Sequence, residues 1–311
     1  MVVTRLRAAG CVFAEDEARL LFSAARTPGD LAAMVDRRAA GQPLEHVLGW
    51  AEFCGLRIAV DPRVFVPRRR TEFLVHQAAA LVREAAGQAV QTAVAAITAA
   101  PTVAAVGAIT AAPAATAVPP TTAAPAAPAD GPCAGPRAVV VDLCCGSGAV
   151  GVALAAAPGR VELHAVDVDP AAAACARGNV AACGGQVYEG DLYEPLPDRL
   201  RGRVDVLVAN VPYVPSEEVG LLPAEARIHE PRVALDGGTD GLDVLRRVTA
   251  AAPQWLAPGG CLLVETSERQ APRAVETVAR TGLIARVASS GELNATVVIG
   301  ARPARPSGPG R

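Results

Sequence analysis

The sequence predicts an α/β fold: a doubly wound, mostly parallel sheet of seven strands, preceded by a small N-terminal domain of helices and a β-hairpin. From Arg137 onward, short apolar runs alternate with helical segments, as in sheets whose strands are joined by crossover helices. A glycine-rich loop follows the first run. The last two runs are separated only by the turn Ser289–Gly291, so one strand should lie antiparallel to its neighbours. The predicted strands are Ala138–Leu143, Glu162–Val166, Gln186–Glu189, Val204–Ala209, Gly260–Glu265, Leu283–Ala288 and Ala295–Ile299.

Residues 1–86 make up the predicted N-terminal domain. Up to about residue 40, apolar residues recur at helical spacing, and the turn Thr27–Asp30 divides them into two groups. Between Gln42 and Val66 the pattern changes to short strands bounded by turn residues, which predicts a hairpin. A further helix should begin near Thr71 and end near Ala86.

Residues 87–136 differ in composition from the rest of the chain. No charged residue occurs between Glu84 and Asp130, and the hexapeptide Ala-Ile-Thr-Ala-Ala-Pro occurs twice, at residues 96–101 and 108–113. Four prolines between residues 101 and 120, and the low hydrophobicity of Ala and Thr, argue against a membrane-spanning helix. We expect a disordered Ala/Pro/Thr linker, followed by the sheet domain over residues 137–302 and a flexible tail over residues 303–311.

Charge and cysteine content exclude several classes of function. The net charge of −2 gives no general electrostatic reason to bind nucleic acid. The 29 basic residues are all arginine, which excludes lysine-based chemistry. The eight cysteines include no Cys-x-x-Cys pair, so no metal site is expected. The N-terminus lacks the apolar core of a secretory signal, and we expect a cytoplasmic protein with reduced thiols.

The loop after the first predicted strand reads Asp-Leu-Cys-Cys-Gly-Ser-Gly over residues 142–148. Gly146, Gly148 and Gly151 match the pattern G-x-G-x-x-G between a strand and a helix, where glycines let the backbone approach a ligand. This pattern alone fits either a dinucleotide or S-adenosylmethionine. Cys144 and Cys145 are interpreted as small residues tolerated in the loop, because adjacent cysteines form strained disulfides.

Three acidic residues at the ends of successive predicted strands favour S-adenosylmethionine. Asp167 can accept hydrogen bonds from both ribose hydroxyls of an adenosine-bearing cofactor. Asp142 lies just ahead of the loop, where an acid would repel a pyrophosphate but suits a cationic sulfonium or ammonium group. Asp191 can accept a hydrogen bond from an adenine amino group. A capping role would explain any one of these acids but explains all three poorly.

The fourth predicted strand ends in Val-Ala-Asn-Val-Pro-Tyr-Val, residues 208–214. Asn and Pro are common in turns, so a plain turn is one interpretation. The other is that Asn210 and Tyr213 grip a small planar substrate, because they follow a strand at the same edge of the sheet as the three acids.

Several separated motifs resemble the HemK/PrmC family of protein-glutamine N5-methyltransferases, which are class I S-adenosylmethionine-dependent methyltransferases. The family's Asn-Pro-Pro-Tyr reads here Asn210-Val-Pro-Tyr213, and its Pro-Arg-Pro-x-Thr-Glu reads Pro67-Arg-Arg-Arg-Thr-Glu72. The resemblance continues through residues 190–196 and 230–242 and covers nearly everything except the linker. It implies a Rossmann-like methyltransferase sheet and an enzyme that methylates the side-chain amide of a glutamine.

The resemblance also implies roles for individual residues. The Asn210 side-chain oxygen and the Val211 carbonyl would accept the two amide N–H bonds, while Pro212 stiffens the turn and Tyr213 offers a flat face. Arg69 and Arg70 are interpreted as a solvated charge run. The cofactor would contact Asp142, Gly146, Ser147, Gly148, Asp167, Asp191 and Asn210, and the protein substrate would contact Arg68, Thr71 and Glu72.

The implied partner is a peptide-chain release factor that presents a Gly-Gly-Gln loop to the N-terminal domain, with a ribosomal protein as the second candidate. One alternative is amino methylation of DNA adenine or RNA, and the lack of a basic surface counts against it. The other is a cofactor-binding protein without activity, which rests only on Val211 in place of the usual Pro.

Overall fold

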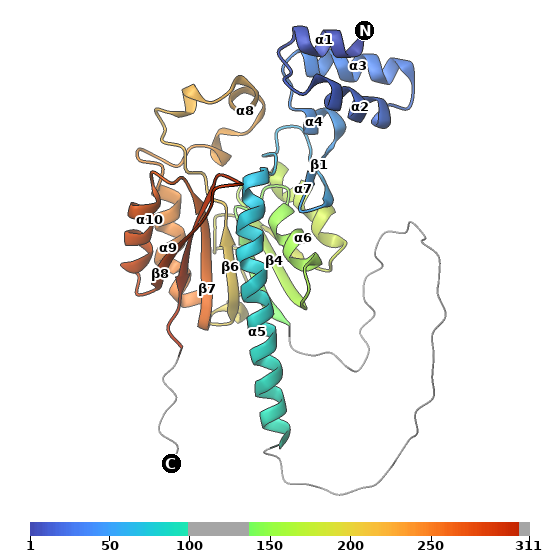
Figure 1. Cartoon of the computed structure of the whole chain (residues 1–311). Helices are drawn as coiled ribbons and strands as arrows, with labels where there is room; N and C mark the ends of the chain where they lie inside the picture. Colours follow the sequence, from blue (N-terminus) through green and yellow to red (C-terminus); the bar gives the residue numbers. More distant parts are fainter. Residues whose placement is uncertain (99–136, 305–311) are drawn as a thin grey trace, which may run out of the picture.

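The computed structural model describes residues 1–98 and 137–304 (Figure 1). The chain begins with a group of four helices whose buried centre includes Leu6, Leu21 and Val35. Thr27 and Asp30 form a capping box, in which each side chain accepts a hydrogen bond from the other residue's backbone N–H. The predicted turn is therefore the start of a helix. The four helices are α1 (Val2–Ala8), α2 (Ala14–Ala24), α3 (Pro28–Ala39) and α4 (Leu44–Leu48).

The predicted hairpin is confirmed. Strands β1 (Trp50–Phe53) and β2 (Leu56–Ala59) pair antiparallel, and the two turn residues between them, Cys54 and Gly55, both have positive φ. The segment just before the hairpin forms the short helix α4, where the sequence predicted strand.

Helix α5 (Glu72–Thr98) follows a short 3-10 turn, Arg69–Thr71, and begins close to its predicted start. It continues past the predicted end near Ala86, because alanine is the strongest helix former and no proline occurs before residue 101. The predicted linker boundary at residue 87 therefore falls inside a helix. The rest of the predicted linker, residues 99–136, and most of the predicted tail lie outside the described residues.

Within the described residues 137–304, the chain forms one seven-stranded sheet, in the order β5-β4-β3-β6-β7-β9-β8. Every neighbouring pair from β5 to β7 is parallel, whereas β9 is antiparallel to both β7 and β8, which confirms the predicted fold class. The predicted strands agree closely with the observed ones; the main difference is β7, which begins earlier than predicted. The strands are β3 (Ala138–Leu143), β4 (Val161–Asp167), β5 (Gln186–Glu189), β6 (Val204–Ala209), β7 (Leu256–Thr266), β8 (Ile284–Ser290) and β9 (Ala295–Ala301).

Helices cover both faces of the sheet (Figure 1). On one face, Leu74 and Val82 of α5 share a core with α6 (Ala149–Ala156) and α7 (Pro170–Ala181). On the other, α9 (Asp243–Trp255) and α10 (Ala271–Ala279) contribute Val248 and Val278 to a second core. Helix α5 belongs to the sheet's core although the sequence placed it in the N-terminal domain, because Leu74 and Val82 are buried in one cluster with residues of the sheet.

Two features place a site at the carboxyl ends of the parallel strands. The chain leaves β3 toward β4 on one side and later returns to β6 on the other, and such a switch in direction opens a crevice at that edge. Between β6 and α9 the chain also makes a long excursion that contains the short helix α8 (Ala224–His229). No helix in the described part of the chain is both long and apolar enough to cross a membrane.

Candidate active site

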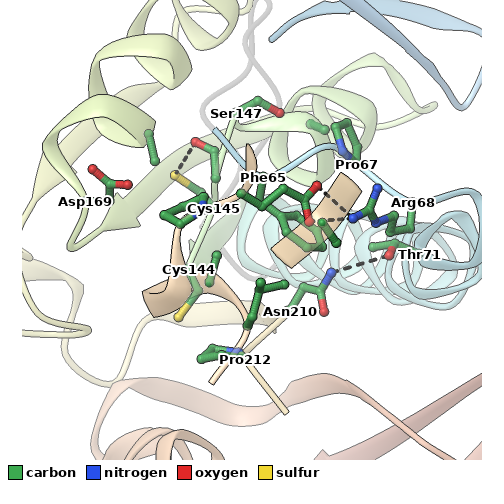
Figure 2. A pocket seen from close by; sticks show the side chains of 18 of the residues that line it. Phe65, Pro67, Arg68, Thr71, Cys144, Cys145, Ser147, Asp169, Asn210 and Pro212 are labelled. Carbon is green, nitrogen blue, oxygen red and sulfur yellow. Dashed lines mark hydrogen bonds and ion pairs between the residues drawn. The ribbon is translucent and has the colours of Figure 1, made fainter. Parts of the chain in front are cut away.

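A cavity of about 860 Å³ lies at this edge of the sheet. Its walls come from the loop after β3, the ends of β4, β5 and β6, and the segment before α5. The N-terminal helices and the excursion that contains α8 also contribute residues. Figure 2 shows how segments distant in sequence meet there, with Thr71, Cys144 and Asn210 around one space. The predicted catalytic residues Asn210, Val211, Pro212 and Tyr213 all line it.

The glycine-rich loop joins β3 to α6 in a tight turn. Gly146 and Gly148 have φ values of 56° and 78°, which glycine adopts without steric cost. Gly146 and Ser147 line the cavity, but Gly148 does not, and a Cβ at Gly148 would come within 3.0 Å of Val180. Gly148 therefore lets α6 pack against α7, whereas the sequence predicted that it would contact the cofactor.

Two of the predicted acids hold this loop in place. Asp142, only 2% exposed, accepts a hydrogen bond of 2.9 Å from the Gly151 N–H. Asp167 accepts from the N–H groups of Gly146, at 2.8 Å, and Asp169, at 2.9 Å. Burial is the main cause that raises the pKa of both carboxyls, to about 7 for Asp142. A cation in the cavity would favour the ionised form of each acid.

The third predicted acid, Asp191, also lines the cavity and forms an ion pair with Arg247 of α9. Both side chains are partly exposed, at 38% and 55%. The sequence did not predict a role for Arg247, because an arginine on a helix has no local feature that connects it with a distant strand end.

The Asn210–Tyr213 turn leaves two acceptors unused. The Asn210 side-chain nitrogen donates to the Thr71 hydroxyl at 3.3 Å (Figure 2), whereas the side-chain oxygen accepts no hydrogen bond from the described part of the chain. The Val211 carbonyl likewise accepts no hydrogen bond from a described residue. Two unpaired carbonyl oxygens, one from the side chain and one from the backbone, thus belong to consecutive residues of the cavity wall.

Residues of the excursion after β6, together with Gln270 just before α10, hold this turn in place. The Gln270 side-chain nitrogen donates to the Tyr213 carbonyl oxygen at 2.9 Å, and the Val214 N–H donates to the Leu235 carbonyl oxygen at 3.1 Å. At Gly237, a Cβ would come within 2.6 Å of the Pro212 carbonyl oxygen, so only glycine fits. The motif over residues 230–242 therefore supports the turn.

Tyr213 belongs to a charged cluster that the sequence analysis did not find. Its hydroxyl donates to Glu265 at 3.3 Å, and Glu265 also pairs with Arg70 at 3.1 Å. The Arg70 guanidinium lies 5.8 Å from the centre of the Tyr213 ring. Burial raises the pKa of Tyr213 to about 12, so its hydroxyl stays protonated and donates.

This cluster corrects the interpretation of Arg70 as part of a solvated charge run. Arg70 lines the cavity and pairs with a glutamate that is 2% exposed, although the Arg70 side chain is itself 45% exposed; Arg69 is also exposed and does not line the cavity. Glu265 ends the apolar run of β7, the same pattern that identified the other strand-end acids, so this pattern could have found it. Its second oxygen, Oε2, is buried and has no hydrogen-bond partner among the residues that the structure describes.

The three predicted substrate contacts have different surroundings. Arg68 lines the cavity, and its Nη2 donates to both carboxylate oxygens of the buried Glu230, at 2.6 and 2.7 Å. Thr71 lines the cavity and accepts from Asn210. Glu72 does not line it: its carboxylate accepts from the Cys54 N–H at 3.0 Å and ties the hairpin to α5.

Comparison with known proteins gives consistent matches. The Methyltransferase small domain family matches residues 134–239. The release factor glutamine methyltransferase of Geobacter sulfurreducens is 35% identical over 260 residues, which cover 82% of this chain and 72% of that protein. The protein of the same name from Streptomyces coelicolor is 34% identical over 76% of this chain and 67% of that protein. The one from Bradyrhizobium diazoefficiens is 31% identical over 89% of this chain and 83% of that protein.

Proposed function

Because the chain belongs to the family of release factor glutamine methyltransferases, we propose that it transfers a methyl group from S-adenosylmethionine to the side-chain nitrogen of a glutamine in a peptide-chain release factor. The observation that carries this proposal is the pair of unused acceptors at Asn210 and Val211. They share a cavity with the glycine-rich loop and the strand-end acids, so acceptor and cofactor can meet there.

The residues at the loop end of the cavity fit S-adenosylmethionine. When bound, this cofactor supplies an electrophilic methyl group on a positively charged sulfonium. A buried carboxyl with a raised pKa, Asp142, favours a cation beside it, and its position next to the loop disfavours a pyrophosphate. Asp167 would bind the ribose and Asp191 the adenine, while Gly146 and Ser147 let the backbone approach.

Asn210 and Val211 would hold the acceptor amide. An amide nitrogen is a poor nucleophile because its lone pair is delocalised into the carbonyl. Two carbonyl oxygens that accept its two N–H bonds orient the nitrogen and favour the positive charge that develops on it. Thr71 fixes the Asn210 side chain by accepting from its nitrogen, which leaves the oxygen for the substrate.

Tyr213 would form the flat wall of the acceptor site. Glu265 holds its hydroxyl, and Arg70 lies over its ring, so the ring has a fixed orientation. The Asn210–Tyr213 turn keeps its backbone acceptor although Val211 stands where the family has Pro, because the proposed contact uses the carbonyl and not the side chain.

The test is methyl transfer from labelled S-adenosylmethionine by the purified full-length chain. A release factor with its Gly-Gly-Gln loop intact should be labelled, and the same factor with that Gln changed to Ala should not. A ribosomal protein fraction and total RNA serve as competing acceptors. Labelling of RNA, or equal labelling of both release factors, would refute the proposal.

A further inference from the structure

The cavity extends well beyond the space around the glycine-rich loop. Its outer part, called here the outer groove, runs between the N-terminal helices and the excursion after β6, which face each other above the sheet edge (Figure 1). One wall includes Phe13, Asp16, Glu17 and Glu45, and the other includes Glu225 and Val233. Neither the strand-end acids nor the Asn210–Tyr213 turn lies in this part.

The outer groove carries an excess of negative charge. Among the described residues that line it, four carry a carboxylate and only Arg38 carries a guanidinium, which Glu17 contacts at 2.7 Å and Glu225 at 3.2 Å. Glu45 has no ion-pair partner in the described part of the chain, and Asp16 pairs only with Arg19, in a contact where both side chains are largely exposed. Such an exposed pair screens little of the field that a ligand in the groove would meet.

The arginines deeper in the cavity do not offset this charge. Arg68 is neutralised by Glu230 and Arg70 by Glu265. On the excursion, Arg227 does not line the cavity, and Arg232 pairs with Asp236 outside it. A ligand in the outer groove therefore meets a net negative wall.

Large apolar side chains are exposed beside the same carboxylates. Phe13 is 69% exposed and Val233 is 51% exposed, and both line the groove from opposite sides. Leu221, which is 81% exposed, precedes the lining residue Leu222, and Ile228, which is 65% exposed, follows the lining residue Ala226 by two positions. Exposed apolar side chains gathered around a groove are typical of a surface that binds another protein.

We propose that the outer groove binds a polypeptide segment of the substrate that flanks the acceptor glutamine and carries arginine or lysine together with apolar side chains. This inference rests on the proposed function, because it takes the acceptor to be a glutamine in a protein. Cationic side chains complement the four carboxylates, and apolar ones cover Phe13 and Val233. A nucleic acid would be repelled by the same wall.

The test uses the full-length protein and fluorescein-labelled peptides centred on Gly-Gly-Ala, in which no glutamine is available for methylation. One peptide carries arginines and leucine on the flanks, a second carries glutamates in place of the arginines, and a third carries serines. Fluorescence anisotropy should give a Kd for the arginine peptide lower than that for the glutamate peptide by on the order of tenfold, with a difference that shrinks at high salt.

Substitutions of groove residues test whether the preference for the arginine peptide arises in the outer groove. Glu45→Gln and Asp16→Asn should each raise the Kd of the arginine peptide about two- to fivefold and leave that of the serine peptide unchanged. Glu52→Gln, at an exposed glutamate of β1 that does not line the groove, is the matched control and should change neither. Unchanged serine-peptide binding also shows that each variant is folded.

Equal affinity for the arginine and glutamate peptides would overturn the proposal, as would an unchanged Kd in both groove variants. Failure of the proposed function is read separately, from methyl transfer to the matching Gly-Gly-Gln peptides. If the arginine peptide binds as expected but no glutamine is methylated, the docking surface stands and the reaction assignment fails.

Discussion

Replacing Asn210 by alanine should separate catalysis from stability. The Asn210 nitrogen makes one hydrogen bond, of 3.3 Å to Thr71, and losing such a bond lowers the free energy of unfolding by about 0.5–1.5 kcal/mol. The side-chain oxygen has no protein partner among the described residues, so removing it leaves no group unpaired. If that oxygen holds the acceptor amide, kcat should fall about 10²–10³-fold, which corresponds to about 2.7–4 kcal/mol of transition-state stabilisation.

Three measurements on the purified variant test this prediction: methyl transfer to an intact release factor, urea unfolding, and calorimetric titration with S-adenosylmethionine. Thr71→Val is the matched control, because it removes the same hydrogen bond and keeps the Asn210 oxygen. It should lose similar stability but far less turnover. Val211→Pro keeps the backbone carbonyl and should retain activity, with some loss of stability because the Val211 side chain is buried.

The plain-turn interpretation predicts the opposite result. If Asn210→Ala unfolds more easily but keeps the turnover of the unmodified chain, the turn serves the fold alone. The assignment of Asn210 to the acceptor amide would then be wrong.

Four further predictions concern the cofactor end, the charged cluster and the linker. Asp167→Ala should weaken S-adenosylmethionine binding by about 1–3 kcal/mol, and an unchanged Kd in calorimetry would remove Asp167 from the site. Burial raises the pKa of Asp142 to about 7, so the folded, ligand-free protein binds a proton on this carboxyl more tightly than the unfolded chain does. The stabilisation from this protonation is therefore lost as pH rises from about 4 through 7. Cofactor affinity should rise with pH across the upper part of that window, and Asp142→Asn should flatten both profiles in thermal unfolding and titration. Glu265→Gln keeps the shape of the side chain but removes the charge that pairs with Arg70. We expect kcat to fall about tenfold while the affinity for the cofactor stays unchanged. Kinetics equal to those of the unmodified chain would exclude a positioning role for Glu265. Replacing residues 99–136 by a short Gly/Ser linker should preserve cooperative unfolding and cofactor binding, because that segment has few large apolar side chains to bury; loss of the transition would refute this.

Local patterns in the sequence were sufficient to predict the sheet and part of the site. Strands buried by flanking helices are continuous apolar runs, so β3 and β6 were predicted with their observed bounds. Residues that end such strands meet at one edge, which is why strand order along the chain was enough to place Asp142, Asp167 and Asn210 together. Helix α5 was predicted too short, because Ala-rich sequence is compatible with both a helix and a linker.

Only the tertiary structure decided which charges meet. Arg70 and Glu265 are 195 positions apart, and Arg68 and Glu230 are 162 apart, so no local spacing pairs them. Whether an arginine in the run Arg68–Arg70 is solvated or neutralises a buried carboxylate depends on what packs above it, here the excursion after β6 and the end of β7. Side-chain patterning repeats over a few residues and therefore specifies elements and their buried faces, whereas the partners of a charged group are set by how those faces pack. The sequence alone thus placed the strand-end acids and the Asn210–Tyr213 turn at one edge of the sheet, whereas the acidic outer groove depends on how the N-terminal helices and the excursion lie in the tertiary structure.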